Sequence, residues 1–201
     1  MKYLILSLLS LSLIGCGEDL SSWTEPELQP YKDTFLQEAA SYGISLKTSN
    51  LEMRLGQTRE GVAGVCTKVE KHFLDGGGIQ KSITISRSYW EAAPEFVREF
   101  VVFHELGHCL LDQGHDTREK VAVRVIDEDR VYTTTVEPSY MSTSINRYRT
   151  PVIYEKLRQY YLDELFMGAD LTNSDDVEFI SSSLSKASNR EDHALCDHNQ
   201  Y

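Results

Sequence analysis

Two histidines and a glutamate in one short stretch carry the side chains best suited to chemistry. His104 and His108 stand four residues apart, so on a helix they lie on one face, one turn from each other. Two imidazoles so placed can bind one metal ion, and Glu105 follows the first of them, beside the ion rather than on it. A carboxylate there can deprotonate a metal-bound water and direct it at a carbonyl carbon. The pattern predicts a zinc-dependent hydrolase, with Zn²⁺ as cofactor and Glu105 as catalytic base.

A helix with an apolar face has to hold these side chains in place. Apolar residues recur at spacings of three and four through the same segment, which indicates a buried helical stripe, and Pro94 suits the first turn of the helix. The alternative is a helix with two incidental histidines, which requires both the spacing and the glutamate to be accidental. The stripe comprises Phe96, Phe100, Phe103, Leu106 and Leu110.

A third ligand is expected shortly after the helix, because a catalytic zinc site has three protein ligands. Gly114 can take the left-handed conformation that ends a helix, and His115 follows it directly. We therefore expect His115 to complete the set. Asp112, one turn further along the same helical face, and Asp116 are the alternatives.

The stretch from His104 to His115 resembles the fingerprint of the metzincin metallopeptidases. In that family a glycine stands three residues after the second histidine; here Leu111 occupies that place, and the third histidine comes one residue later than usual. The resemblance covers about 51–166 and implies peptide-bond hydrolysis at one zinc ion held by His104, His108 and His115. It also implies an α+β fold, in which a mixed sheet packs on the metal-binding helix and a methionine turn and a C-terminal helix follow.

The methionine turn of that family matches the stretch from Ser139 to Thr143. Met141 stands at its centre, and the resemblance gives its thioether the place of a floor under the histidines, without ligation. An ordinary core methionine is the alternative interpretation. Tyr140 and Tyr148 are near this turn in the sequence, but neither matches a family position well enough to be given a role.

The start of the chain predicts export. Residues 3–14 form an apolar run that suits the core of a signal peptide and is short for a membrane span. The run ends in Leu13-Ile14-Gly15-Cys16, which resembles a bacterial lipobox and implies removal of residues 1–15 and lipid attachment at Cys16. A plain secretory signal is the alternative. We expect a protein anchored in the bacterial cell envelope, facing the periplasm or the surface, with the outer membrane favoured because Gly17 rather than Asp follows the cysteine.

The formal net charge of −11 argues against nucleic acid or anionic lipid surfaces as partners. We expect a monomer that acts on peptides or proteins. The pattern of the remaining chain suggests a tether over 16–30, a metallopeptidase domain over 31–168 and a polar tail over 169–201. The expected elements are a helix over 31–42, strands over 51–55, 62–69 and 79–89, a hairpin over 121–136 and a helix over 152–167.

Three cysteines remain if Cys16 is lipidated. Cys66 is on an expected strand and Cys109 on the metal-binding helix, so the two face each other if that helix packs on the sheet; we predict this disulfide. Cys196 leaves other pairings open. It also forms a loose cluster with His193 and His198, for which an unstructured tail with scattered polar residues is the simpler interpretation.

Two other functions compete with the main interpretation. One keeps the two helical histidines and takes a downstream acid, Glu119 or Glu155, as third ligand, as gluzincin-type hydrolases do. The other is a non-catalytic lipoprotein that only binds metal. Glu105 argues against the second, because a binding module has no need of a base at that position.

Overall fold

The computed structural model describes residues 22–71, 77–127, 130–145, 151–169, 177–179 and 193–194. Several predicted features lie outside these residues. They are the signal peptide over 1–15, the lipidation site Cys16, Tyr148, and Cys196 with His198 in the tail.

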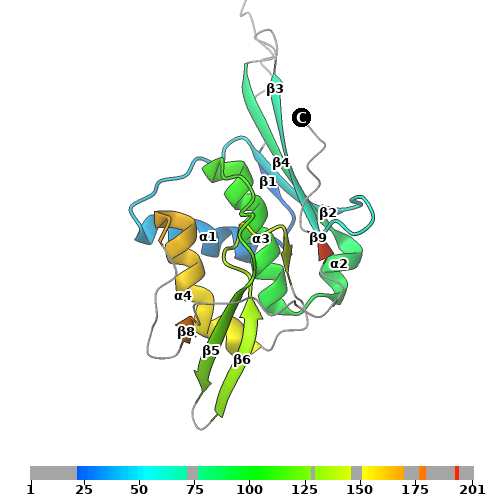
Figure 1. Cartoon of the computed structure of the whole chain (residues 1–201). Helices are drawn as coiled ribbons and strands as arrows, with labels where there is room; N and C mark the ends of the chain where they lie inside the picture. The colour runs from blue at the N-terminus through cyan, green and yellow to red at the C-terminus, as the bar shows by residue number, and fades with distance from the viewer. Residues whose placement is uncertain are drawn as a thin grey trace, which may run out of the picture.

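The described residues form an α+β fold with a mixed sheet, as expected, and the fold has four helices rather than the three that the sequence predicted. The main sheet has the strand order β1-β2-β4-β3. Strands β1 and β2 are parallel, β2 and β4 are parallel, and β3 runs antiparallel to β4, which leaves β3 at one edge (Figure 1). The strands are β1 (Trp23–Thr24), β2 (Leu51–Gly56), β3 (Gly64–Lys71) and β4 (Gly78–Ser86).

Alternating side chains explain the central strand β2. Leu51, Met53 and Leu55 are buried on one face, whereas Glu52 and Arg54 between them are not. The strand expected over 79–89 ends earlier, at Ser86.

Ser86 ends β4 because it caps a helix that the sequence pattern did not predict. Its hydroxyl accepts a hydrogen bond from the backbone N–H of Tyr89, at 3.4 Å, and helix α2 (Arg87–Ala92) follows. Serine is a favoured residue at this position, because its oxygen satisfies a backbone donor that the first helical turn leaves open.

The fold begins before residue 31, so residues 22–30 differ from the predicted tether. The backbone N–H of Glu25 donates to the carbonyl of Met53 at 2.8 Å, and the Glu25 carboxylate accepts the N–H of Leu55 at 2.5 Å. Leu28 is fully buried, and helix α1 (Gln29–Ser41) starts directly after it. Strand pairing and one buried leucine thus attach this segment to the sheet.

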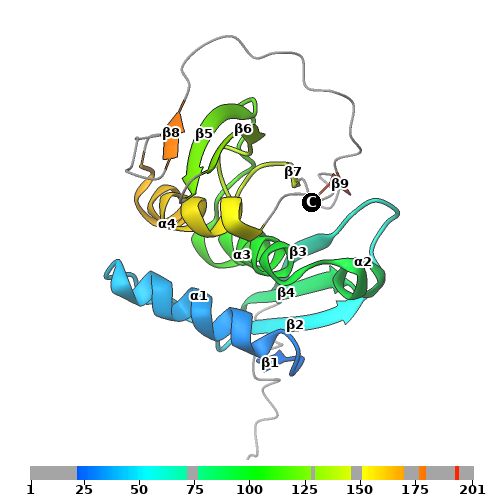
Figure 2. The same cartoon turned by 90° about the horizontal axis from the view of Figure 1, so that it is seen from below.

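Helix α3 (Glu95–Leu111) lies at the centre of the molecule, between the sheet and helix α4 (Pro151–Met167) (Figure 2). It also contacts α1, where the rings of Phe35 and Phe103 meet edge to face with centroids 5.1 Å apart. A helix that is covered on several sides is apolar over most of its surface. Its fully buried residues include Val97, Val101, Val102, Phe103, His104, Glu105, Leu106 and Cys109.

The hairpin expected over 121–136 forms as β5 (Val121–Asp127) and β6 (Arg130–Val136). Two short strands from the predicted tail add to the fold: β8 (Val177–Phe179) pairs with β5, and β9 (His193–Ala194) pairs with β7 (Ser144–Ile145). Among the described helices, none has both the length and the apolarity to cross a membrane.

Candidate metal centre

Three histidines converge on one point. The Nε2 atoms of His104 and His108 are 3.1 Å apart, those of His108 and His115 are also 3.1 Å apart, and those of His104 and His115 are 3.2 Å apart. The first two side chains come from α3 and the third from the segment after it. His104 is fully buried, and the other two are partly exposed. The structure therefore places the three predicted ligands together, at a point that solvent can reach.

Backbone carbonyls determine which nitrogen of two of these rings carries the proton. Nδ1 of His104 is 2.7 Å from the carbonyl oxygen of Tyr140, and Nδ1 of His108 is 2.6 Å from that of Gln113. A carbonyl only accepts, so both Nδ1 atoms must donate. In a neutral imidazole the Nε2 atom then has a lone pair, and these lone pairs point at the common centre.

Lone pairs that face each other at this distance repel, unless a cation lies between them. A zinc–nitrogen bond is about 2.0–2.1 Å, so nitrogens 3.1–3.2 Å apart subtend about 100° at the ion. That angle is close to tetrahedral, so the three nitrogens have the spacing that a site with three protein ligands to zinc would require. The donor set and its spacing fit a small divalent cation such as Zn²⁺.

Asp112, rather than Gly114, reverses the chain after α3. Asp112 has a φ of 56° and caps the helix, whereas Gly114 does not have positive φ. Aspartate tolerates the left-handed region better than most residues with a side chain. The Asp112 carboxylate forms an ion pair with Lys68 of β3, which lowers its pKa and helps to hold this cap. The sequence correctly predicted a reversal here but placed it two residues too late.

The other candidate ligands lie elsewhere. Asp112 forms an ion pair with Lys68, and Asp116 accepts hydrogen bonds from the backbone and guanidinium of Arg118. Glu119 and Glu155 are exposed on the surface. Within the described part of the chain, the cluster that can hold a metal consists of the three histidines alone. The interpretation that takes a downstream acid as third ligand therefore has no support in this geometry.

Glu105 is fully buried at the edge of the main sheet. A Cβ atom built on Gly64, the first residue of β3, would lie 2.6 Å from Oε1 of Glu105. The absence of a side chain at Gly64 is thus what allows the strand to pass over the carboxylate. Glu105 follows His104 directly on α3, and its contact with β3 restricts the position of its carboxylate.

Met141 lies against the metal-binding helix in a tight turn. A Cβ atom built on Gly107 would be 2.5 Å from its sulfur, so the thioether packs directly on the helix between the first two ligands in sequence. The N–H of Ser142 donates to the carbonyl of Ser139 at 3.3 Å, and the N–H of Asp116 donates to the carbonyl of Met141 at 2.7 Å. The turn is thereby joined to the segment that carries the third histidine.

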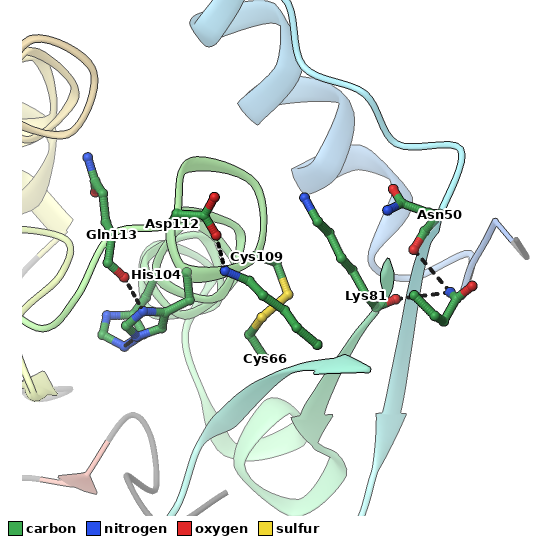
Figure 3. Close-up of a disulfide and its surroundings, with 10 residues drawn as sticks. Asn50, Cys66, Lys81, His104, Cys109, Asp112 and Gln113 are labelled. Carbon is green, nitrogen blue, oxygen red and sulfur yellow. Dashed lines mark hydrogen bonds and ion pairs between the residues drawn. A yellow bond between two sulfur atoms is a disulfide. The ribbon is translucent and has the colours of Figure 1, made fainter. Parts of the chain in front are cut away.

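A disulfide joins Cys66 of β3 to Cys109 of α3, one residue after His108 (Figure 3). It is the middle one of three contacts that run along the two elements. Alternate strand residues advance by about 6.6 Å and one helical turn by about 5.4 Å, so the elements stay in step over this length. The three contacting pairs are Gly64 with Glu105, Cys66 with Cys109, and Lys68 with Asp112.

Sequence reasoning missed the groups that orient the ligands. The carbonyls of Tyr140 and Gln113 are backbone atoms, which every residue has, so no residue pattern indicates them. The one feature of the sequence that could have drawn attention to either residue is that Tyr140 directly precedes Met141 of the predicted methionine turn.

Comparison with known proteins identifies the family. No curated protein and no solved structure matches the chain. A family model described as "Putative phage metallopeptidase" matches residues 36–148, which is more than half of the chain and includes the three histidines, Glu105 and Met141. The chain therefore belongs to this metallopeptidase family.

Proposed function

We propose that this protein is a zinc-dependent peptidase in which His104, His108 and His115 hold the metal. The observation that carries the proposal is the convergence of three Nε2 atoms within 3.2 Å of one another. Imidazole nitrogens in this number are the usual ligands of catalytic zinc. Met141, packed on Gly107, supports a metzincin-like site in which the third histidine comes late.

Glu105 acts as the general base and acid in this proposal. A bound zinc ion supplies Lewis acidity, which polarises the scissile carbonyl and makes water easier to deprotonate. The Glu105 carboxylate accepts a proton from the attacking water and then donates it to the departing amine. Its burial under Gly64 restricts its rotamers, so the carboxylate is oriented before substrate arrives.

The edge of β3 suits an extended peptide as substrate. Among the described strands β3 pairs with β4 alone, and its first residues run past Glu105. A peptide that adds to the free edge of this strand gains backbone hydrogen bonds that do not depend on its sequence. This arrangement favours the interior of an unfolded or extended chain over a compact small molecule.

The substitution Glu105→Gln tests the mechanism. It keeps the size of the side chain but removes the proton acceptor, so we expect zinc content equal to that of the parent and peptide hydrolysis reduced by at least about 10²-fold. Zinc is measured by elemental analysis and hydrolysis with a quenched-fluorescence peptide library. Hydrolysis at the parental rate by the zinc-loaded variant would show that Glu105 is not the base.

We further propose that the protein is a monomer held in the bacterial cell envelope by lipid at Cys16. The stretch Leu13-Ile14-Gly15-Cys16 after an apolar run supports this proposal. The full-length protein, expressed in a bacterium fed labelled palmitate, should incorporate label and sediment with membranes. The variant Cys16→Ser should do neither. Equal labelling of both proteins would contradict lipidation at Cys16.

A further inference from the structure

A partly buried polar cluster lies between α3 and α4. It is centred on one oxygen of the Glu99 carboxylate, which accepts hydrogen bonds from Tyr154 at 2.9 Å and from the Arg158 guanidinium at 2.6 Å. Arg158 also pairs with Glu38 of α1 at 2.8 Å. The cluster therefore joins three helices through groups that are costly to bury without partners.

Tyr140 connects this cluster to the methionine turn. Its hydroxyl lies 2.6 Å from that of Tyr154 and 3.4 Å from the Glu99 carboxylate. Because a carboxylate only accepts and Tyr154 is the nearer donor, Tyr154 donates to Glu99 and accepts from Tyr140.

The same residue holds a metal ligand at its other end. The ring of Tyr140 is fully buried and is packed against Phe100 and Phe103, with centroids 4.9 and 5.3 Å away. Its backbone carbonyl, 2.7 Å from Nδ1, accepts the hydrogen bond from His104. A residue whose side chain is fixed by packing and by a directional hydrogen bond has little freedom to turn its carbonyl.

We propose that Tyr140 is a positioning residue for the metal site: its hydroxyl, anchored through Tyr154 to Glu99, holds its carbonyl in place so that His104 presents Nε2 to the metal. The proposal rests on the metal site described above but not on peptide hydrolysis. A displaced carbonyl leaves His104 free to rotate or to change its tautomer, and either change weakens one of three ligands.

The test compares three tyrosine-to-phenylalanine variants of the whole protein. Tyr161 is the matched control, because it is also buried, packs on the Tyr140 ring at 5.3 Å and donates to the Glu137 carbonyl at 3.1 Å, outside the Glu99 cluster. Zinc affinity is measured by competition with a chelating dye. The coordination sphere is followed in the visible spectrum of the cobalt-substituted protein.

We expect Tyr140→Phe to weaken zinc binding by about tenfold and to change the cobalt spectrum, as loss of support for a metal-bound histidine does elsewhere. Tyr154→Phe should have a smaller effect, because the Tyr140 hydroxyl is already 3.4 Å from Glu99 and can donate to it directly. Tyr161→Phe should leave affinity and spectrum at the parental values.

A purely structural role for Tyr140 predicts a different result. Tyr140→Phe and Tyr161→Phe would then lower the melting temperature similarly and leave zinc affinity and the cobalt spectrum unchanged, which would overturn the proposal. If Tyr140→Phe fails to fold, Tyr154→Phe decides: an affinity and spectrum identical to the parent's overturn it. Absence of peptidase activity in the parent would contradict the proposed function but leave these metal measurements valid.

Discussion

The two sides of helix α3 are held in different ways. On the sheet side, β3 contacts the helix through a glycine, a disulfide and a surface ion pair, at Gly64, Cys66 and Lys68. On the α4 side, buried hydroxyl groups and the Glu99–Arg158 pair form a connected hydrogen-bonded cluster. The first side has few polar contacts and one covalent bond, whereas the second depends on correct hydrogen bonding in the interior.

This difference assigns different tasks to the two sides. Contacts with β3 act on the position of the helix and of Glu105, because they involve the backbone of the strand and the side chain of Glu105, the proposed base. The cluster on the other side acts on the direction in which His104 points, through the carbonyl of Tyr140. Placement of the base and orientation of a ligand should therefore respond separately to substitution.

The disulfide should make the largest contribution to stability of any single feature on the sheet side. Cys66 and Cys109 are 43 residues apart in sequence, and a loop of that length predicts a contribution of about 4 kcal/mol to the free energy of unfolding. The double substitution Cys66→Ala and Cys109→Ala should lower the urea midpoint accordingly, as should reduction of the parent. Unfolding curves that coincide with and without reductant would mean that the bond does not stabilise the fold.

Gly64→Ala should separate placement of the base from metal binding. The added methyl group would lie 2.6 Å from Oε1 of Glu105, so the carboxylate has to move. A misplacement of about 1 Å can cost about 10²-fold in rate, and we expect that loss in kcat/KM with zinc affinity unchanged. Gly114→Ala is the control, because a Cβ there meets nothing within 4 Å. Equal activity of the two variants would show that the close approach of Gly64 to Glu105 does not position the carboxylate for catalysis.

Raising the pH should destabilise the hydrogen-bonded packing against α4 before it affects the contacts between α3 and β3. Burial raises the pKa of Tyr140 and Tyr154 well above the usual value of about 10, and that of Tyr42, which donates to Asp163, to about 12. A tyrosine whose pKa is raised by folding stabilises the fold fully below the unfolded pKa and loses that contribution as pH rises above it. We expect melting temperature to fall above about pH 10, and less so in Tyr42→Phe. A melting temperature that stays constant to pH 12 would contradict this.

Prediction from sequence succeeded where the signal was local. The positions of His104, Glu105 and His108 follow from helical geometry over five residues, and the apolar stripe around them indicated burial. The hairpin over 121–136 follows from alternation within each strand. Family membership over 36–148 agrees with the metallopeptidase that this motif predicted.

Prediction was wrong or incomplete where distant residues decide the local structure. The chain reversal at Asp112 has its partner in Lys68, 44 residues earlier in the sequence. Residues 22–30 were predicted to be part of a tether, but Trp23 and Thr24 pair with β2. A short stretch of sequence cannot predict such contacts, because they join residues that are far apart in the chain and meet only in the folded protein.

The sequence by itself determined the residue types of the site and their spacing along α3, because residues four apart on a helix lie on the same face. The tertiary structure decided which carbonyls orient the imidazoles, which strand covers Glu105, and how a buried tyrosine links a metal ligand to an ion pair behind the helix. Those features depend on backbone atoms and on neighbours far away in the chain, and a linear pattern of side chains contains neither.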